Sequence, residues 1–220
     1  MSYTSLKERY LDSLQKYSDI QEYLTTLLKF GKKVNHITEF GVCTGISTCA
    51  FLNAKPKRMI AYDIYKQTEV DELIKLSKKE NIDFQYKLDN ILFVEIEPTD
   101  LLFIDTIHNY DQTKAELMLH ANKVSKYIIF HDVVQYGIQG HAIGQTGIMP
   151  AIMEFLKNNA DWQVIDFRDD GAGLMVLEKN SKNHQGMEIF ENISKQLDDN
   201  NLKYFLICSD SLCKQIKMRV

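Results

Sequence analysis

Short apolar runs alternate with amphipathic stretches along most of the chain. Apolar runs of strand length predict strands at residues 36–40, 59–62, 84–88, 100–104, 127–130, 162–167 and 174–177. The stretches between them predict helices at residues 47–53, 69–80, 113–122 and 150–158. Continuously apolar strands that alternate with helices are typical of a parallel sheet covered on both faces. We therefore expect an α/β, Rossmann-like doubly wound sheet of about seven strands.

Both ends of the chain depart from this alternation. Residues 4–30 carry apolar side chains at helical spacing, which predicts one or two helices that end at Gly31. No helix separates the last two predicted strands, so we expect an antiparallel edge there. Beyond them, a polar stretch precedes a predicted helix at 187–197 and an apolar run at 204–208. The sequence thus predicts one domain over 1–220, with N-terminal helices at 1–31, a core at 34–179 and a C-terminal appendage at 180–220.

Composition and charge narrow the class of protein. The 220 residues are 45% hydrophobic and 25% charged, with a net charge of −4, which is typical of a soluble globular protein. The acidic balance argues against a dedicated nucleic-acid binder. No apolar run is long enough to span a membrane, and the four cysteines lack CxxC spacing. The first nine residues lack the apolar region of a signal peptide, so we expect no export signal. We expect a cytoplasmic protein that could form a homo-oligomer through its N-terminal helices.

The first candidate site follows the first predicted strand. Glu39 ends that strand, Gly41 and Gly45 follow with G-x-x-x-G spacing, and Ser47 opens the next helix. A glycine turn and the free N–H groups of a helix start can cradle a polar ligand. No Lys-Ser/Thr pair follows Gly45, and Cys43 stands where a dinucleotide fingerprint has its middle glycine, so neither phosphate motif is present. A purely structural turn is the competing interpretation.

Two further acids strengthen the case for a ligand. Asp63 ends the second predicted strand, where doubly wound folds place an acid that holds ribose hydroxyls. Asp89 ends the third predicted strand, where it could border an adenine ring. Each acid alone is commonly a solvated strand end, but acids at the ends of three strands together favour a nucleotide-like ligand.

A second cluster of polar residues follows the fourth and fifth predicted strands. If those strands are neighbours, Asp105 and Asp132 converge, and such carboxylates suit Mg²⁺ or Mn²⁺. Helix capping is the alternative for such acids, and Asp111 is assigned only to a helix start. His108 is equally compatible with a structural and a catalytic role. His131 is expected to be a neighbour rather than a ligand, because alternate strand residues face opposite ways.

With these motifs the chain resembles class I S-adenosylmethionine-dependent methyltransferases. It is most similar to the branch of small-molecule and sugar O-methyltransferases (methyltransferase family 24) and cephalosporin-hydroxylase-like proteins. That branch carries E-x-G-x-x-x-G-x-S, an acid ending strand two, I-D-G-D-H-S-Y and F-H-D. The matching stretches here, within residues 34–179, are 39–47, Tyr62-Asp63, 104–110 and 130–132.

The resemblance implies roles for the candidate residues. Glu39, Gly41, Gly45 and the motif's Ser47 would surround the methionine part of S-adenosylmethionine. The ribose would bind Asp63, and the adenine would lie beside Asp89. Two acids, Asp105 and Asp132, would hold a divalent Mg or Mn ion that binds the hydroxyls of a small-molecule acceptor, such as a sugar.

The chain departs from the branch at one place that bears on chemistry. Thr106 and Ile107 replace the glycine and second acid of the D-G-D-H motif, which leaves His108 as the nearest candidate base. We therefore expect metal-assisted O-methylation, with His108 and Asp105 as catalytic residues. A catalytically inactive binding protein, which Ile107 would favour, and a nicotinamide-dependent oxidoreductase are the alternatives.

Overall fold

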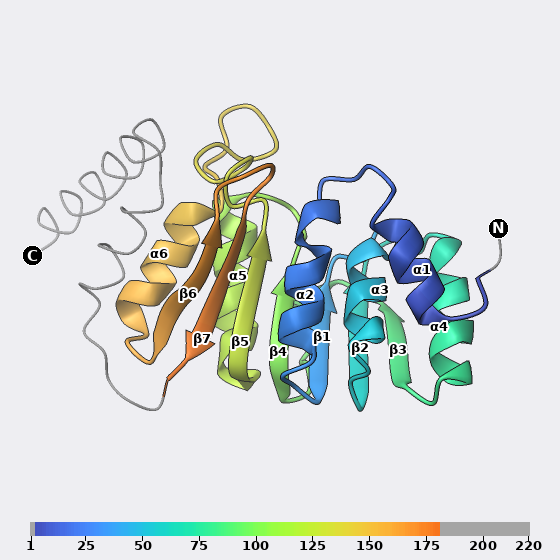
Figure 1. Cartoon of the computed structure of the whole chain (residues 1–220). Coiled ribbons are helices and arrows are strands. Elements are labelled where there is room, and N and C mark those ends of the chain that lie inside the picture. Colours follow the sequence, from blue (N-terminus) through green and yellow to red (C-terminus); the bar gives the residue numbers. More distant parts are fainter. Residues whose placement is uncertain (1–2, 181–220) are drawn as a thin grey trace, which may run out of the picture.

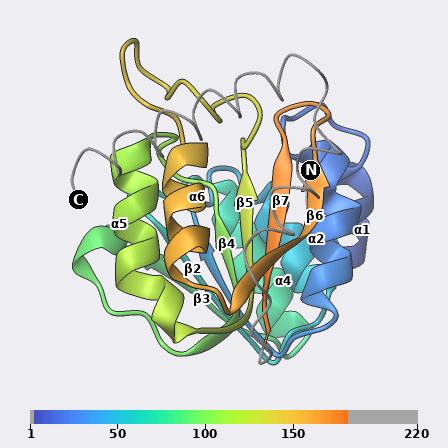
Figure 2. The ribbon, with the colours of Figure 1, turned by 90° about the vertical axis from the view of Figure 1, so that its left-hand side faces the viewer.

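The computed structural model describes residues 3–180 as a central sheet of seven strands with helices on both faces (Figures 1 and 2). The strands are β1 (His36–Phe40), β2 (Arg58–Asp63), β3 (Asp83–Leu88), β4 (Thr99–Ile104), β5 (Val124–His131), β6 (Trp162–Arg168) and β7 (Leu174–Lys179). The α-helices are α1 (Leu6–Ser13), α2 (Leu24–Gly31), α3 (Ile46–Asn53), α4 (Glu69–Lys79), α5 (Tyr110–His120) and α6 (Met149–Asn158). One-turn 3₁₀ helices are η1 (Gln21–Tyr23), η2 (Ile91–Phe93) and η3 (Ala121–Lys123). The sequence-based fold class is confirmed, and the predictions for 187–197 and 204–208 lie outside the described residues.

The strand order defines where a ligand can bind. The order is β3-β2-β1-β4-β5-β7-β6, and β1 to β5 all run parallel. The chain winds outward from β1 to β3 and then returns to place β4 on the other side of β1. Such a reversal opens a crevice outside the carboxyl ends of the strands. At the other edge, β7 pairs antiparallel with both β5 and β6. The sequence predicted this antiparallel edge because no helix separates the last two strands.

Alternating side chains in the central strands build two separate cores. Leu101 and Phe103 of β4 pack in one cluster of buried residues, whereas Leu102 and Ile104 pack in the other. This two-residue period sends successive side chains to opposite faces of the sheet. Both faces therefore need helices to cover them, which explains the continuous apolar run in this strand.

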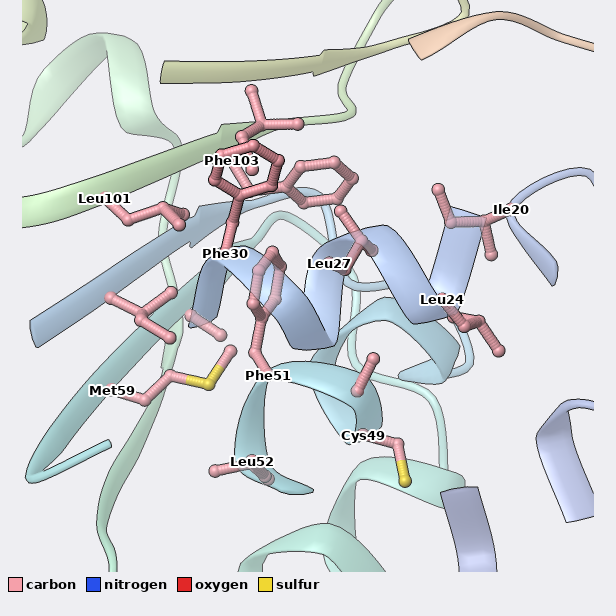
Figure 3. Close-up of a cluster of buried hydrophobic side chains, with 14 of the residues drawn as sticks. Ile20, Leu24, Leu27, Phe30, Cys49, Phe51, Leu52, Met59, Leu101 and Phe103 are labelled. Atoms are coloured by element: carbon pink, nitrogen blue, oxygen red, sulfur yellow. The ribbon is translucent and has the colours of Figure 1, made fainter. Parts of the chain in front are cut away.

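The helices divide between the two faces in line with the chain's winding. Helices α1 to α4 pack on one face, and α5 and α6 cover the other (Figure 2). On the first face, the ring of Phe51 meets that of Phe103 edge-on at 5.4 Å between centroids (Figure 3). Edge-on aromatic pairs add to the free energy of burial. This packing fixes α3, and with it the loop between β1 and α3.

Two local predictions can be compared with the structure. The N-terminal helices occur as α1, η1 and α2, and α2 ends at Gly31 as expected. The start of α5 is a correction, because the helix begins at Tyr110 and not at residue 113. Its cap is Asn109, whose side-chain oxygen accepts the N–H of Gln112 at 2.9 Å, while Asp111 lies inside the first turn. The helices within residues 3–180 are too short or too polar to span a bilayer.

Candidate cofactor and metal site

A cavity of about 260 Å³ opens where β1 and β4 separate, at the carboxyl end of the sheet. Its walls come from the loops that follow the first four strands. The lining residues are Gly41, Val42, Cys43, Tyr62, Asp63, Ile64, Asp89, Asn90, Ile91, Asp105, Thr106, Ile107 and Gln112. The predicted residues Gly41, Asp63, Asp89 and Asp105 are thus brought together. Glu39, Gly45 and Ser47 do not line the cavity.

Gly41 allows two loops to touch beneath the cavity. Its φ is +83°, and a Cβ at this position would lie 1.9 Å from the carbonyl oxygen of Asp105. No side chain could be accommodated there without moving the backbone that follows β4. The glycine therefore sets the distance between the first loop and the start of the β4–α5 loop.

Asp63 organises the same loop from the end of β2. Its Oδ2 accepts the N–H groups of Val42 at 2.8 Å and Cys43 at 3.0 Å. Its Oδ1 accepts the N–H of Tyr65 at 3.0 Å. Three backbone donors thus fix the carboxylate at the cavity wall, a loop-holding role that the sequence pattern did not indicate.

Glu39 lies underneath the loop, with both carboxyl oxygens paired. Oε1 accepts the hydroxyl of Ser47 and Oε2 accepts that of Thr48, each at 2.6 Å. The side chain is fully buried, and this burial raises its pKa to about 8 despite the two hydrogen bonds. Glu39 and Ser47 therefore tie β1 to the first turn of α3.

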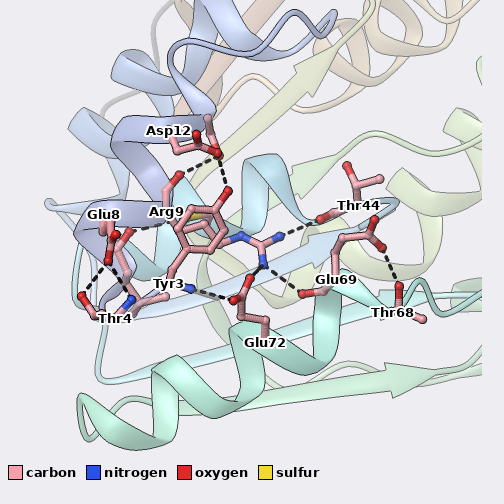
Figure 4. A network of polar contacts seen from close by, with 12 residues as sticks. Tyr3, Thr4, Glu8, Arg9, Asp12, Thr44, Thr68, Glu69 and Glu72 are labelled. Atoms are coloured by element: carbon pink, nitrogen blue, oxygen red, sulfur yellow. Dashed lines mark hydrogen bonds and ion pairs between the residues drawn. The ribbon is translucent and has the colours of Figure 1, made fainter. Parts of the chain in front are cut away.

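Arg9 supports the loop from α1, and no sequence motif pointed to it (Figure 4). Its guanidinium donates to the carbonyl oxygens of Thr44 and Glu69, each at 3.0 Å. It also pairs with Glu72 at 2.9 Å, although Arg9 is only 6% exposed. The one available signal was its position beside Tyr10, on the apolar stripe of α1. The N-terminal helix is thereby attached to the turn that lines the cavity.

Asp105 extends the cavity into a cluster of titratable groups. Because β4 and β5 are neighbouring parallel strands, Asp105 and Asp132 lie side by side at their ends, as predicted. Ligand atoms of Asp105, Asp132 and His131 all lie within 4.8 Å of one another. Asp132 and His131 are almost completely buried, whereas Asp105 is partly exposed toward the cavity.

His131, which was expected to be a neighbour of the site rather than a ligand, lies within reach of both acids. Its Nδ1 lies 3.2 Å from Asp105 Oδ1 and 3.3 Å from Asp132 Oδ2. Strand alternation predicts the direction of a side chain only while the backbone remains extended. Here β5 ends at His131, and Asp132 has a φ of +62°, which turns its carboxylate back toward the histidine.

His108 reaches the same cluster from the loop after β4, as the sequence predicted. Its Nε2 lies 2.7 Å from Asp132 Oδ2 and 3.3 Å from Asp105 Oδ1. Its ring stacks on that of Tyr136 at 4.7 Å with an angle of 7° between the planes. His141, from the same glycine-containing loop as Tyr136, donates its N–H to the carbonyl oxygen of His108 at 3.0 Å.

The charges in this cluster stabilise one another. Burial alone would lower the pKa of both histidines, but the hydrogen bonds to the two acids raise it to about 9 for His108 and about 10 for His131. In turn, burial would raise the pKa of Asp105 and Asp132, and the histidines hold both below their usual range. Both carboxyls are therefore ionised at neutral pH.

The donor set in the cluster is compatible with a divalent cation. Asp132 Oδ1 is buried and has no hydrogen-bond partner among the described residues. A buried carboxylate oxygen without a partner is costly unless a cation or a hydrogen-bond donor reaches it. Two carboxylates and an imidazole match the ligand preferences of Mg²⁺ or Mn²⁺, with the imidazole favouring Mn²⁺.

Comparison with known proteins supports the fold. No protein-family model and no curated protein sequence matches the chain. Among solved structures it is similar to the O-methyltransferase TomG of Streptomyces achromogenes in complex with SAM, at 13% identity and a TM-score of 0.57, covering 82% of this chain and 92% of that one. It is also similar to an O-methyltransferase of Bacillus cereus in complex with SAH, at 16% identity and a TM-score of 0.54, with the same coverage of 82% and 92%.

A third similar structure differs in the atom that is methylated. It is the 1,6-didemethyltoxoflavin-N1-methyltransferase of Burkholderia thailandensis with bound S-adenosylhomocysteine, at 14% identity and a TM-score of 0.57, covering 77% of this chain and 82% of that one. The chain therefore has the class I methyltransferase fold. Because this fold serves both O- and N-methyltransferases, it does not define the acceptor.

Proposed function

We propose that the protein is an S-adenosylmethionine-dependent methyltransferase that methylates an oxygen of a small hydroxylated acceptor with the help of a divalent metal. The observation that carries this proposal is the position of Asp105. It lines the cavity and also belongs to the Asp105–His131–Asp132 cluster. A cofactor in the cavity and an acceptor at the cluster would thus be neighbours.

The cofactor half of the proposal assigns a role to each part of the cavity. Gly41, Val42 and Cys43 line the cavity, and the N–H groups of Val42 and Cys43 are held by Asp63. Asp63 would accept the ribose hydroxyls, and Asp89 would border the adenine. Similar structures that contain SAM or SAH support this assignment at the level of the fold.

The acceptor half of the proposal depends on residues at and just after the ends of β4 and β5. Asp105, Asp132 and His131 would hold the metal, which would lower the pKa of a bound acceptor hydroxyl. Methyl transfer is an in-line displacement, so the chain mainly has to align the acceptor oxygen with the methyl group. We propose that the buried cluster provides that alignment, because its side chains are fixed on the ends of two adjacent strands.

His108 is the proposed general base, but its charge limits when it can act. With both carboxylates beside it, its pKa of about 9 keeps the imidazole protonated at neutral pH, after the opposing effect of burial. A base must be unprotonated to accept the hydroxyl proton. We therefore propose that His108 becomes a base only when the charges of Asp105 and Asp132 are balanced by another cation.

One observation favours a second candidate, a binding protein without turnover. Ile107 stands where the resembling branch has its second acid, and its side chain is 52% exposed beside the cavity. An isoleucine can neither bind metal nor accept a proton. If this candidate is right, the chain binds S-adenosylmethionine but transfers no methyl group to any acceptor.

Labelled S-adenosylmethionine, offered with a panel of hydroxylated small molecules, tests the proposal. Transfer of label should require Mg²⁺ or Mn²⁺ and stop when a chelator is added. Asp105→Asn and Asp132→Asn should lower turnover by orders of magnitude, and His108→Ala should lower it while leaving cofactor affinity nearly unchanged. The matched control is Asp111→Asn, an exposed acid in the first turn of α5, which should behave like the native chain.

The outcomes of this experiment separate the parts of the proposal. Turnover that persists with chelator and in both aspartate variants would contradict metal assistance. Unchanged turnover in His108→Ala would show that His108 is a structural residue of the turn. Cofactor binding without label transfer would favour the non-catalytic candidate.

A further inference from the structure

Glu116 is a buried acid that the proposed chemistry does not use. It lies on α5 and is 0% exposed. Oε1 accepts the hydroxyl of Thr106 at 2.5 Å and the side-chain N–H of Gln112 at 2.8 Å. Its Oε2 is buried and has no hydrogen-bond partner within residues 3–180. A buried acid with one unpaired oxygen is costly and calls for a functional explanation.

Both donors to Glu116 line the cofactor cavity, although Glu116 itself does not. The backbone of Gln112 is also fixed, since its N–H donates to the cap residue Asn109 at 2.9 Å. The side-chain nitrogen of Gln112 donates a hydrogen bond to Glu116. Within the described part of the chain no hydrogen bond uses its carbonyl oxygen. The Gln112 carbonyl oxygen is therefore an acceptor that remains available to a ligand.

The lining of the cavity suits a flat base. Ile91 from the segment after β3 and Ile107 from the β4–α5 loop are apolar residues of this lining, which also includes Asp89 and Asn90. A purine stacks on apolar side chains and is distinguished by the groups on its edge. A carbonyl oxygen at that edge accepts from an amino group and repels another carbonyl oxygen.

We propose that Glu116 is a positioning residue that holds the amide of Gln112 so that its carbonyl oxygen selects a purine with a 6-amino group over one with a 6-oxo group. The inference rests on the proposed function, because it assumes that the purine of S-adenosylmethionine occupies this cavity. Glu116 acts through Gln112 and does not contact the ligand. Thr106, which stands where the resembling branch has glycine, supplies the second donor that keeps Glu116 in place.

The protonation state of Glu116 does not alter this arrangement. Burial raises its pKa to about 7, against the hydrogen bonds from Thr106 and Gln112. Oε1 accepts both of those hydrogen bonds whether or not the unpaired Oε2 carries a proton. The selection is therefore expected to be the same across neutral pH.

Calorimetric titration with two ligands tests the inference on the full chain. The ligands are S-adenosylhomocysteine and S-inosylhomocysteine, which differ in the 6-amino and 6-oxo groups of the purine. The native chain should bind the adenine form about tenfold or more tightly, the range expected for one hydrogen bond to a partly buried group. Glu116→Gln, which allows the Gln112 amide to turn over, should reduce this preference to about threefold or less.

Gln112→Met provides a second variant that removes the selecting atom and leaves the buried acid in place. It should lose the preference to a similar extent, and the double variant Glu116→Gln/Gln112→Met should lose no more than Gln112→Met alone. Glu154→Gln on α6, also an acid-to-amide change, is the matched control and should keep the native preference. The ratio of the two affinities is the informative quantity, because a general loss of stability weakens the binding of both ligands alike.

The results distinguish this inference from the proposed function beneath it. An unchanged ratio in Glu116→Gln or Gln112→Met, with S-adenosylhomocysteine still bound, would overturn the role of Glu116 and leave the cofactor assignment intact. A loss of preference in the double variant that equals the sum of the single losses would also overturn it. Failure of the native chain to bind S-adenosylhomocysteine would instead contradict the proposed function.

Discussion

Glu39 is an acid next to the last residue of β1, a strand that is buried on both faces, and its two hydroxyl partners show how the chain accommodates it. Ser47 and Thr48 satisfy both oxygens, yet burial keeps the pKa near 8, far above the ordinary 4.5 of a glutamate. The folded chain thus holds a proton on Glu39 that the unfolded chain releases near pH 4.5.

This difference predicts how stability depends on pH. Folding takes up a proton between about pH 4.5 and 8, so the free energy of unfolding should fall as pH rises through that window. The contribution of Glu39 is at most about 1.4 kcal/mol per pH unit, the limit for one proton. Urea unfolding of the native chain and of Glu39→Gln between pH 5 and 8 measures it. The variant should show a shallower slope, and parallel slopes would contradict the assignment.

Single residues differ in how far the sequence could predict them. Gly41, Asp63, Asp105 and Asp132 lie at the strand ends where the sequence put them, because the apolar pattern predicts where each strand ends. Their partners were predicted less well, since hydrogen bonds depend on the backbone of another segment. His131 is the clearest case, because the left-handed backbone of Asp132 that brings the two together has no signal in residue type.

At the scale of elements, α1 acts as a support for the cofactor loop. Arg9 is the only residue of that helix that donates to the loop among the described hydrogen bonds, and its target is the carbonyl oxygen of Thr44. Its other partners, the carbonyl oxygen of Glu69 and the carboxylate of Glu72, belong to α4. One buried side chain thus connects α1, the loop and α4.

Replacing this side chain should affect both stability and ligand binding. We expect Arg9→Met to lower the free energy of unfolding by about 1–3 kcal/mol, because it leaves partly buried acceptors without their donor. It should also weaken the binding of S-adenosylhomocysteine, because the loop at Thr44 then loses its hydrogen bond to α1. Lys16→Met is the control: Lys16 also pairs with an acid, but in solvent, and its loss should change little. Equal effects of the two substitutions would contradict the role given to Arg9.

The loop at residues 133–147 is the second element with an expected function. The N–H of His141 donates to the carbonyl oxygen of His108 in the β4–α5 loop at 3.0 Å, and the N–H of Tyr110 at the start of α5 donates to the carbonyl oxygen of Thr146 at 2.9 Å. The tip of the loop is exposed, with Ile143 at 97%, and Gly144 has a φ of +82°. The chain can therefore change its conformation at the tip while both ends of the loop remain anchored.

We predict that this loop covers the acceptor when cofactor and metal are bound. Limited proteolysis with thermolysin should then cut near Ile143 more slowly in the presence of S-adenosylhomocysteine and Mn²⁺. The same addition should protect Asp132→Asn much less, because that variant lacks a proposed metal ligand. Equal rates of cleavage with and without ligands would argue against a lid.

The elements themselves were largely predictable, and their ends were not. Apolar strands buried on both faces stand out in the sequence, so every strand was found within a few residues. The start of α5 was missed because Asn109 and Asp111 are both good helix caps, and only the extended backbone at Asn109 decides between them. The supporting position of α1 depends on contacts across 60 residues and has no local pattern.

At the scale of the whole molecule, the winding of the sheet explains why the site exists. The strand order reverses between β1 and β4 while the strands stay parallel, so the loops after four strands meet around one cavity. The alternation of strands and helices was sufficient to predict this edge, because doubly wound sheets bind ligands there. The sequence pattern alone could not define the acceptor, since the residues that would contact it come from loops of irregular structure.

Calorimetric titration of the native chain with S-adenosylhomocysteine tests the central claim most directly. We predict one binding site, no heat with NADH, and a loss of about 1–3 kcal/mol of binding free energy in Asp63→Ala, because the ribose and the loop N–H groups lose their charged acceptor. Absence of binding to the native chain, or equal affinity of the native chain and Asp63→Ala, would contradict the account.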